Sequence, residues 1–402
     1  MGMSSGVSET FLTEQVSVVS SNGDAANLAI SGFTRVSQLL TLFDGKILNA
    51  EDPLKWDTKG TGTAAYADNS VTLSVTAGQY LVRQGRFFCP YFSGKPQIVE
   101  LTSISMQNQE GLVKRMGYFS SNAVAPYDSN KDGVWLEADG TNYRLVTSRN
   151  GTVTHNVPWT SWDNYDLVKD YDWSKFSVTE MDFLWLGGAG LRFFLVVNGQ
   201  FQLIHTIKNH AGYQDGLIFS SPNQPVRYEI RSTTGAGSLR SVCSQVATEG
   251  GTPNEAGEGL SWYSSLLACN TVGQTYALVG ARLQTNQRNR FVPVTQFGGA
   301  LSTNDTGILM LLLNPTLSTP LTWTNVSRVQ QGQASEGTTV TNPGRILKAV
   351  PVVSSGVASE APSAALRTLS CGIDNTLGEI VVAYAPLTAN QTISGTIQVI
   401  EY

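Results

Sequence analysis

The feature that most restricts the fold is a two-residue alternation of apolar and polar side chains, which recurs along the chain between glycine and asparagine residues. Residues 70–76 place Val71, Leu73 and Val75 on one face, because successive side chains of a strand point to opposite sides. Residues 392–400 repeat the pattern near the other end. No segment predicts a helix longer than about three turns. The alternation therefore predicts an all-β protein built from short strands.

The composition fits strands and argues against two other classes of protein. Charged residues make up 14% of the chain, against about 25% in typical globular proteins. Eight tryptophans, fourteen tyrosines and fifteen phenylalanines are too many for a disordered chain. The net charge is −5 without a block of lysine or arginine, so the basic footprint of a nucleic-acid-binding protein is missing.

The clearest local signal is a hairpin within residues 191–207. Asn198-Gly199 stands between two strand-like runs, and a type I′ turn needs positive φ at both of these positions. The turn predicts three facing pairs: Val196 with Phe201, Phe194 with Leu203, and Arg192 with His205. It also predicts a core face made of Phe194, Val196, Phe201, Leu203 and Ile207. We interpret His205 as a packed, hydrogen-bonded histidine rather than a ligand or a base.

A composition shift divides the chain. Residues 249–259 contain four glycines and a proline but no bulky apolar residue, which is typical of a linker. Strands at short intervals on both sides indicate sandwiches or jelly rolls. We therefore predict two consecutive antiparallel β-sandwich or jelly-roll domains, residues 51–250 and 251–402. Residues 1–50 differ in pattern and predict either an N-terminal arm that attaches to a neighbour or a frayed terminus.

The cysteines and the chain's hydropathy indicate synthesis in a reducing cytoplasm. Cys89, Cys243, Cys269 and Cys371 are widely spaced and match no zinc pattern, so four buried free thiols are expected. The N-terminus lacks a basic region followed by an apolar core. No run approaches 18 apolar residues, so we expect no membrane insertion.

One segment predicts a metal site. Asp128, Asn130 and Asp132 stand at positions one, three and five of a loop, Gly133 at six and Asp139 at twelve. Hard oxygen donors at this spacing, with a glycine for the sharp turn, resemble a calcium loop. The twelfth residue is a short aspartate and a strand-like run follows the glycine, so a plain Asx turn is the alternative. Calcium is the one cofactor that the sequence suggests.

A second segment predicts contact with a glycan. Four aromatic residues on one polar loop could stack on a sugar: Trp159, Trp162, Tyr165 and Trp173. Nearby carboxylates Asp163, Asp166 and Asp172 could supply the pair that a glycosidase needs. The alternative is a polar loop pinned by aromatic anchors. Because only three histidines occur and no catalytic motif is found, we predict that the protein is not an enzyme.

Several segments, in this order along the chain, resemble a family of β-rich structural proteins of tailed-bacteriophage particles. The resemblance covers roughly residues 43–402 and rests on motifs that are individually weak and not catalytic. They are Phe43-Asp-Gly-Lys-Ile-Leu48, Trp56 with Gly60-Thr-Gly-Thr63, Ala77-Gly-Gln-Tyr80, Tyr91-Phe-Ser-Gly-Lys95, Lys114-Arg-Met-Gly-Tyr-Phe119, Asp132-Gly-Val-Trp-Leu-Glu137, Phe183-Leu-Trp-Leu-Gly-Gly188 with Leu191-Arg-Phe193, His205, Pro225-Val-Arg-Tyr-Glu-Ile230, Val246-Ala-Thr-Glu-Gly-Gly251, Leu313-Asn-Pro-Thr-Leu317 with Trp323, and Ile400-Glu-Tyr402.

The resemblance implies a structural subunit of the phage virion, such as a head fibre or a neck or tail appendage. It implies a homo-oligomer in contact with capsid, portal, neck or tail proteins, and exposed loops that contact a host-surface glycan. No binding residue is carried over from the family. Two other hypotheses remain open: a carbohydrate-binding, lectin-like protein, and a glycan depolymerase that uses the carboxylates of the aromatic loop.

Overall fold

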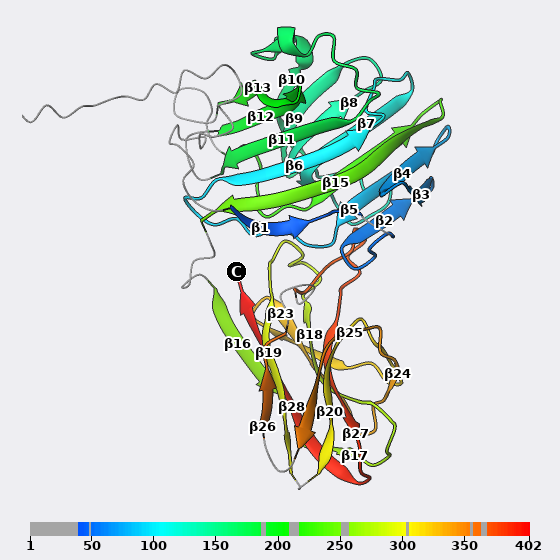
Figure 1. Cartoon of the computed structure of the whole chain (residues 1–402), viewed down its shortest axis with the longest axis vertical. Coiled ribbons are helices and arrows are strands. Elements are labelled where there is room, and N and C mark those ends of the chain that lie inside the picture. Colours follow the sequence, from blue (N-terminus) through cyan, green and yellow to red (C-terminus); the bar gives the residue numbers. More distant parts are fainter. Residues whose placement is uncertain are drawn as a thin grey trace, which may run out of the picture.

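The computed structural model describes residues 39–47, 50–185, 190–208, 217–250, 257–302, 305–353, 357–362 and 368–402. Within them the protein is nearly all β, and its strands form antiparallel sheets, which confirms the predicted fold class. Two sandwiches follow each other along the chain, with the first at the top and the second at the bottom of Figure 1. Most of the predicted arm, residues 1–38, lies outside the described residues.

The first sandwich pairs an eight-stranded sheet with a seven-stranded sheet (Figure 1). The eight-stranded sheet has the order β13(Gln200–Ile207), β12(Gly190–Val197), β11(Ser177–Leu184), β6(Gln97–Ile104), β15(Gly237–Glu249), β4(Ser70–Val75) and β3(Thr63–Ala67), with β1(Leu39–Asp44) also on β15. The seven-stranded sheet has the order β10(Thr152–Pro158), β9(Tyr143–Arg149), β8(Asp132–Ala138), β7(Leu112–Ser120), β14(Val226–Ser232), β5(Tyr80–Gly85) and β2(Trp56–Gly60). Because β1 pairs with β15, the first sandwich begins before residue 51.

The second sandwich is smaller and consists of two main sheets and a short ribbon. One sheet has the order β16(Glu258–Tyr263), β28(Gln391–Glu401), β19(Val294–Leu301) and β26(Val357–Glu360), with β17(Leu267–Cys269) also on β28. The other has the order β22(Thr322–Val326), β23(Val329–Gln333), β18(Tyr276–Leu283), β27(Ile380–Pro386), β20(Thr306–Leu313) and β25(Arg345–Val353). The ribbon pairs β21(Thr316–Leu317) with β24(Val340–Asn342).

Helical structure in the described residues is limited to two single 3₁₀ turns, η2(Trp159–Ser161) and η3(Tyr165–Leu167). No helix in this part of the chain has the length and hydrophobicity of a membrane span. Each sandwich has its own apolar core. Strand parity explains both cores, because every second side chain of a strand points between the sheets.

The hairpin of β12 and β13 forms with the predicted turn but with a different core face. Asn198 and Gly199 have φ values of 53° and 80°, and two of the three expected pairs are present. A bulge after Phe193 places His205 opposite Phe193 instead of Arg192. Of the predicted core face only Ile207 is in the core cluster, which takes Leu191, Phe193 and Leu195 from β12 and Ile204 from β13 instead. Since β12 is apolar on both faces, its sequence alone does not reveal which face points inward.

One other expectation needs correction. All four cysteines are free, but only three are buried, because Cys243 is exposed on β15. Burial raises the pKa of the Cys371 thiol to about 11, so this thiol is inert at neutral pH.

The two sandwiches are held together by polar contacts and a small apolar cluster. Asp57 Oδ2 accepts a hydrogen bond from the Ile373 amide at 2.7 Å, and Lys59 Nζ lies 2.8 Å from Asp374 Oδ2. The Ile373 side chain packs with Val82 and Tyr127 of the first domain. These contacts dock the domains, so a cavity between them exists before any ligand arrives.

Candidate functional site

A pocket of about 480 Å³ opens where the two domains meet. Its walls come from both sandwiches, and its lining residues are Pro90, Tyr91, Phe92, Ser93 and Asn223 of the first domain and Gly257, Glu258, Arg328, Glu401 and Tyr402 of the second. Small-molecule sites occur preferentially at domain interfaces and combine apolar rings with a few polar groups. The pocket has both properties, and we take it as the candidate functional site.

The aromatic wall is built by two segments that are far apart in the sequence. The Tyr402 ring follows β28 and meets the Phe92 ring edge to face, with centroids 6.2 Å apart. It also lies 5.8 Å from the Phe291 ring, and its amide donates to the Phe291 carbonyl at 3.1 Å. On the first domain, the Tyr91 amide donates to Asn223 Oδ1 at 2.8 Å. Backbone hydrogen bonds therefore fix the aromatic wall from both sides.

The polar wall belongs to the second domain and carries more negative than positive charge. Glu401 is almost fully buried, and its carboxylate accepts from Arg328 Nη1 at 3.2 Å and from Ser327 Oγ at 2.9 Å. Arg328 remains about half exposed, so its other N–H groups reach the pocket. Glu258 adds a second carboxylate on the exposed rim. Two carboxylates against one guanidinium favour a neutral or cationic ligand over an anionic one.

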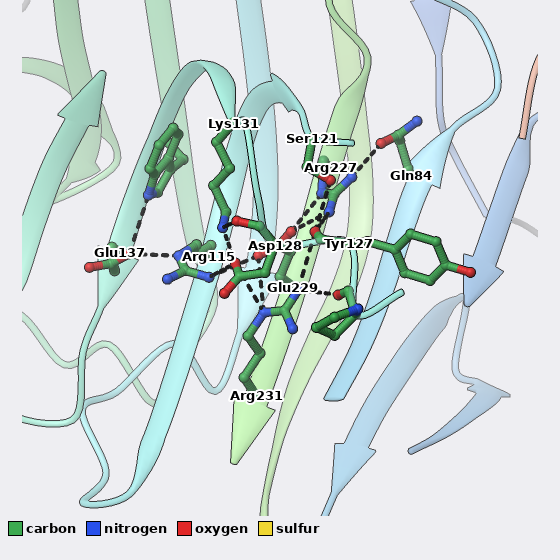
Figure 2. A network of polar contacts seen from close by, with 12 residues as sticks. Gln84, Arg115, Ser121, Tyr127, Asp128, Lys131, Glu137, Arg227, Glu229 and Arg231 are labelled. Atoms are coloured by element: carbon green, nitrogen blue, oxygen red, sulfur yellow. Dashed lines mark hydrogen bonds and ion pairs between the residues drawn. The ribbon is translucent and has the colours of Figure 1, made fainter. Parts of the chain in front are cut away.

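A buried ionic network lies on the outer face of the seven-stranded sheet (Figure 2). Glu229 of β14 lies at its centre, 2.7 Å from Arg227 Nε and 3.0 Å from Arg115 Nη1. Burial alone would raise the pKa of Glu229, but Arg227, Arg115, Lys131 and Arg231 together hold it well below its usual range. Arg227 and Glu229 are fully buried, so they are structural groups that no ligand reaches.

This network fastens the loop of residues 121–131 to the sheet. Arg227 Nη2 donates to the Tyr127 carbonyl at 2.7 Å, and the Asp128 carboxylate pairs with Lys131 and with Arg115. The same loop contacts the second domain, because Arg288 donates to the Ser121 carbonyl. The ionic network therefore fixes a loop that contacts the second domain.

The four residues of the predicted calcium loop do not converge on one point. Asp132 accepts hydrogen bonds from the Ser221 amide at 2.9 Å and from Gln224 Nε2 at 2.7 Å, and Asp128 is paired with cations. Asp139 caps the turn after β8 and pairs with Arg144, and Asn130 lies in a tight turn with φ 53°. The described residues contain no group of three or more acidic, histidine or cysteine side chains arranged to hold a metal. Calcium binding stays a prediction that this arrangement does not support.

The aromatic loop is partly core and partly surface. Trp162 and Trp173 are buried in the first core, and Trp162 Nε1 donates to the Val157 carbonyl at 3.2 Å. Trp159 and Tyr165 are half-buried, with ring centroids 5.4 Å apart. Only these two of the four predicted glycan contacts therefore reach the surface, and their contact with a glycan stays a prediction.

The carboxylates of the aromatic loop have separate partners. Asp163 Oδ2 lies 3.1 Å from His205 Nδ1; burial lowers the pKa of His205, and Asp163 opposes that shift. Asp166 pairs with Lys169 on the surface, whereas Asp172 binds the Ser174 amide and hydroxyl. These hydrogen bonds and ion pairs stabilise the loop.

Sequence reasoning did not identify the pocket, because its walls come from widely separated segments. Two of those segments, 91–95 and 400–402, appear in the phage resemblance, but nothing in their residue types indicates a shared cavity. The density of aromatic residues in short turn-rich segments is the available signal, but it points to residues 159–173, where Trp162 and Trp173 pack inward.

Comparisons with known proteins give similar structures but no related sequence. No protein-family model and no curated protein matches the chain. Similar solved structures include a legume lectin-like domain from Entamoeba histolytica, with 12% identity over 52% of this chain and 98% of that domain and a TM-score of 0.35. The Emp47p carbohydrate recognition domain matches with 12% identity, 54% and 100% coverage, and a TM-score of 0.36.

A third similar structure comes from a phage. It is described as the carbohydrate esterase vb_24B_21 from the Shiga toxin-encoding bacteriophage phi24B, with 12% identity, 53% and 100% coverage, and a TM-score of 0.32. Similarities of this size do not identify what the present chain binds.

Proposed function

We propose that this protein is a carbohydrate-binding protein whose ligand occupies the pocket between the two domains. The observation that carries the proposal is the pairing of an aromatic wall with a polar wall across a preformed cavity. A sugar ring offers apolar C–H patches for the rings of Phe92 and Tyr402, and hydroxyl groups for Arg328 and Glu258. On a phage particle, such a ligand would be a glycan of the host surface.

A binding role suits the pocket better than a catalytic one. Glycoside hydrolysis needs two carboxyl groups on either side of the scissile bond, one of them able to donate a proton. Both oxygens of Glu401 already accept hydrogen bonds from Arg328 and Ser327. Glu401 is therefore placed to orient the guanidinium group rather than to exchange a proton with a substrate. We propose that the protein binds its glycan without cleaving it.

Three monosaccharides that share one ring test this site: glucosamine, N-acetylglucosamine and glucuronic acid. Titrations followed by NMR of the full chain should show binding in the order cationic, neutral, anionic, because the pocket carries excess negative charge. Replacing Tyr402 by alanine removes one ring of the aromatic wall and should weaken binding about tenfold, the equivalent of about 1.4 kcal/mol. Glu258→Gln should remove the preference for the amine.

The matched control is Trp159→Ala, which alters the aromatic loop of the first domain and leaves the pocket intact. Unchanged affinity in this variant assigns binding to the pocket. Loss of binding in Trp159→Ala with full binding in Tyr402→Ala would move the site to the aromatic loop. No signal for any of the three sugars and none on a glycan array would refute carbohydrate binding.

We also propose that the chain is a subunit of a tailed-phage particle and is located in the virion after synthesis in the host cytoplasm. The proposal is supported by the order of the resembling segments along the chain. Mass spectrometry of purified particles tests this role, and absence of the protein from particles made by its own phage would refute it.

A further inference from the structure

The arginine of the pocket stands on a turn with an unusual backbone. The turn that joins β22 to β23 has two residues, Ser327 and Arg328, because Val326 pairs directly with Val329. Ser327 has a φ of 54°, which is uncommon for a residue with a side chain, and tight hairpins usually place glycine, asparagine or aspartate in such a conformation. Backbone strain of this kind gathers at functional sites. The side chain that this turn brings to the pocket is Arg328.

Hydrogen bonds from two other segments hold this turn. Ser327 Oγ donates to Glu401 Oε2 at 2.9 Å, and Glu401 at the end of β28 is almost fully buried. From the end of β18, Gln284 Nε2 donates to the Ser327 carbonyl at 2.6 Å, and the Gln284 amide donates to the Arg328 carbonyl at 3.3 Å. Strained backbone persists only where the surrounding structure over-determines it, and these contacts do so for Ser327.

The guanidinium group of Arg328 is anchored through one nitrogen. Its Nη1 donates to Glu401 Oε1 at 3.2 Å, and among the described residues the guanidinium has no other hydrogen-bond or ion-pair partner. About half of the side chain is exposed, and the residue lines the pocket. Nε and Nη2 form the edge of the guanidinium that carries two parallel N–H donors. This edge is therefore free to donate to a ligand.

The surroundings of this edge decide which acceptors it suits. Two parallel donors match two neighbouring oxygens, as in a carboxylate or in hydroxyl groups on adjacent ring carbons of a sugar. Glu401 already compensates the charge of Arg328, and Glu258, which also lines the pocket, stands opposite Glu401 in the register of β16 and β28. A carboxylate on the edge would be repelled by Glu258. Hydroxyl groups carry no charge and can donate to Glu258 as well.

We propose that Arg328 determines the specificity of the pocket by selecting sugars with two free hydroxyl groups on adjacent ring carbons. Its Nε and Nη2 donate to the two oxygens, and Ser327 and Glu401 are positioning residues that hold the guanidinium group in place. Because the group is held before the ligand arrives, binding costs little side-chain entropy. This inference rests on the proposed carbohydrate binding and deepens it, since it names the part of the sugar that the pocket recognises.

Deoxy sugars test the inference on the full chain. The methyl glycoside of glucosamine has a single pair of adjacent free hydroxyl groups, on C3 and C4, and a separate hydroxyl group on C6. In NMR titrations, removal of the C3 or the C4 hydroxyl should weaken binding about tenfold, whereas removal of the C6 hydroxyl should have little effect. Equal weakening by all three changes would overturn the inference and leave carbohydrate binding intact. No binding of any of these sugars would refute carbohydrate binding itself, and the inference with it.

Two variants assign this preference to the turn. Arg328→Lys keeps the positive charge but lacks the two parallel donors, so it should bind the parent sugar and its 3-deoxy derivative with nearly equal affinity. Ser327→Ala removes the hydrogen bond to Glu401 and should reduce the preference about threefold, which a role in folding alone would not do. Circular dichroism checks that both variants fold. Full preference in Arg328→Lys would overturn the inference.

The matched control is Arg282→Lys. Arg282 is another arginine of the second domain that pairs with a glutamate, since its Nη1 lies 2.8 Å from Glu379 Oε1, but it does not line the pocket. The preference for the parent sugar over the 3-deoxy derivative should stay about tenfold in this variant. Equal loss of the preference in Arg282→Lys and Arg328→Lys would show that the effect does not come from the turn, and it would also overturn the inference.

Discussion

The two domains differ in what they bury. Among the described residues, the first domain buries many charged side chains and the second buries one, Glu401. Those of the first domain are Asp57, Arg83, Lys114, Lys131, Asp132, Glu180, Asp182, Arg192, Arg227 and Glu229. The second core consists of aliphatic side chains with a few aromatic rings and cysteines.

The difference follows from what covers the outer faces of the sheets in each domain. The outer face of the seven-stranded sheet lies under the loop of residues 121–131, and its covered side chains include Arg227 and Glu229. Charges in such a place must be paired and hydrogen-bonded, because an unpaired buried charge costs several kcal/mol. In the second sandwich the central strand β27 is also buried on both faces, but its buried side chains are Ile380, Val381, Val382, Ala383 and Tyr384. None of them is charged, so dispersion and the hydrophobic effect suffice there. Buried charge in this protein thus fixes the position of loops, and apolar packing holds sheets together.

The largest expected effect tests the buried network. Glu229→Gln keeps the shape of the side chain but leaves Arg227 and Arg115 without their shared anion. We expect the first domain to lose about 4 kcal/mol of stability, since breaking a buried ion pair on one side typically costs about 3–5 kcal/mol. Urea denaturation followed by tryptophan fluorescence measures this, because six of the eight tryptophans belong to the first domain.

Glu379→Gln in the second domain is the matched control. Its carboxylate pairs with Arg282 Nη1 at 2.8 Å, and both side chains are about one quarter exposed. A partly exposed pair is worth about 0–1 kcal/mol. Equal destabilisation by the two substitutions would contradict the contrast between the domains.

The second effect tests the apolar core of the smaller domain. Leu311 on β20 is fully buried within that core, and Leu311→Ala leaves a cavity. The second domain should lose about 3 kcal/mol, within the usual range for such a truncation. Differential scanning calorimetry should show its melting transition at a lower temperature, with the transition of the first domain little changed. A shift of the first transition instead would show that the second core supports the first domain.

The smallest expected effect on stability comes from Lys114, a buried cation whose hydrogen-bond partners are carbonyl groups. Lys114 Nζ donates to the carbonyls of Ser105 and Gln107 at 2.7 and 3.1 Å, and burial lowers the pKa of Lys114 to about 8. The unfolded chain keeps this proton up to about pH 10.4, so it binds more protons than the folded chain above pH 8. Stability from this group therefore rises with pH through that window.

Lys114→Met removes this dependence. Relative to the variant, the wild-type protein should gain about 1 kcal/mol between pH 7 and pH 9. Comparing the two proteins at each pH cancels the contribution of the buried thiols, which has the opposite sign. A constant difference between them over this range would show that Lys114 stays protonated in the fold.

The sequence predicts most strands of this protein, but for some strands it does not predict which side chains are buried. Alternation identifies β4 and β28 well, because each has one apolar and one polar face. Alternation does not show which face of β12 points into the core, because both faces are apolar. In β14 the alternation predicts the wrong environment. Arg227 and Glu229 alternate with apolar residues and would be expected to face solvent, yet both are buried. They are buried because the loop of residues 121–131 covers them. This loop is distant in the sequence, so the pattern within β14 does not predict the contact.

The candidate site cannot be predicted from the sequence for a similar reason, because its residues are far apart in the chain. Tyr91 and Arg328 belong to different domains and meet only when the sandwiches dock. The residue types that suggested sites, such as Asp128 and Trp162, had local explanations. Asp128 compensates for nearby cations and Trp162 fills the core. Residue types in one segment thus indicate a local structural role as readily as a site, and a site assembled across a domain junction leaves no local pattern.

The docked junction has a thermodynamic consequence for any sugar in the pocket. Such a ligand contacts both walls at once, so its binding free energy also opposes separation of the domains. At saturation the two sandwiches should melt together as one cooperative unit. The coupling is reciprocal. Loss of a hydrogen bond between the domains, such as the one from the Ile373 amide to Asp57, would therefore lower the affinity for a ligand that neither residue contacts.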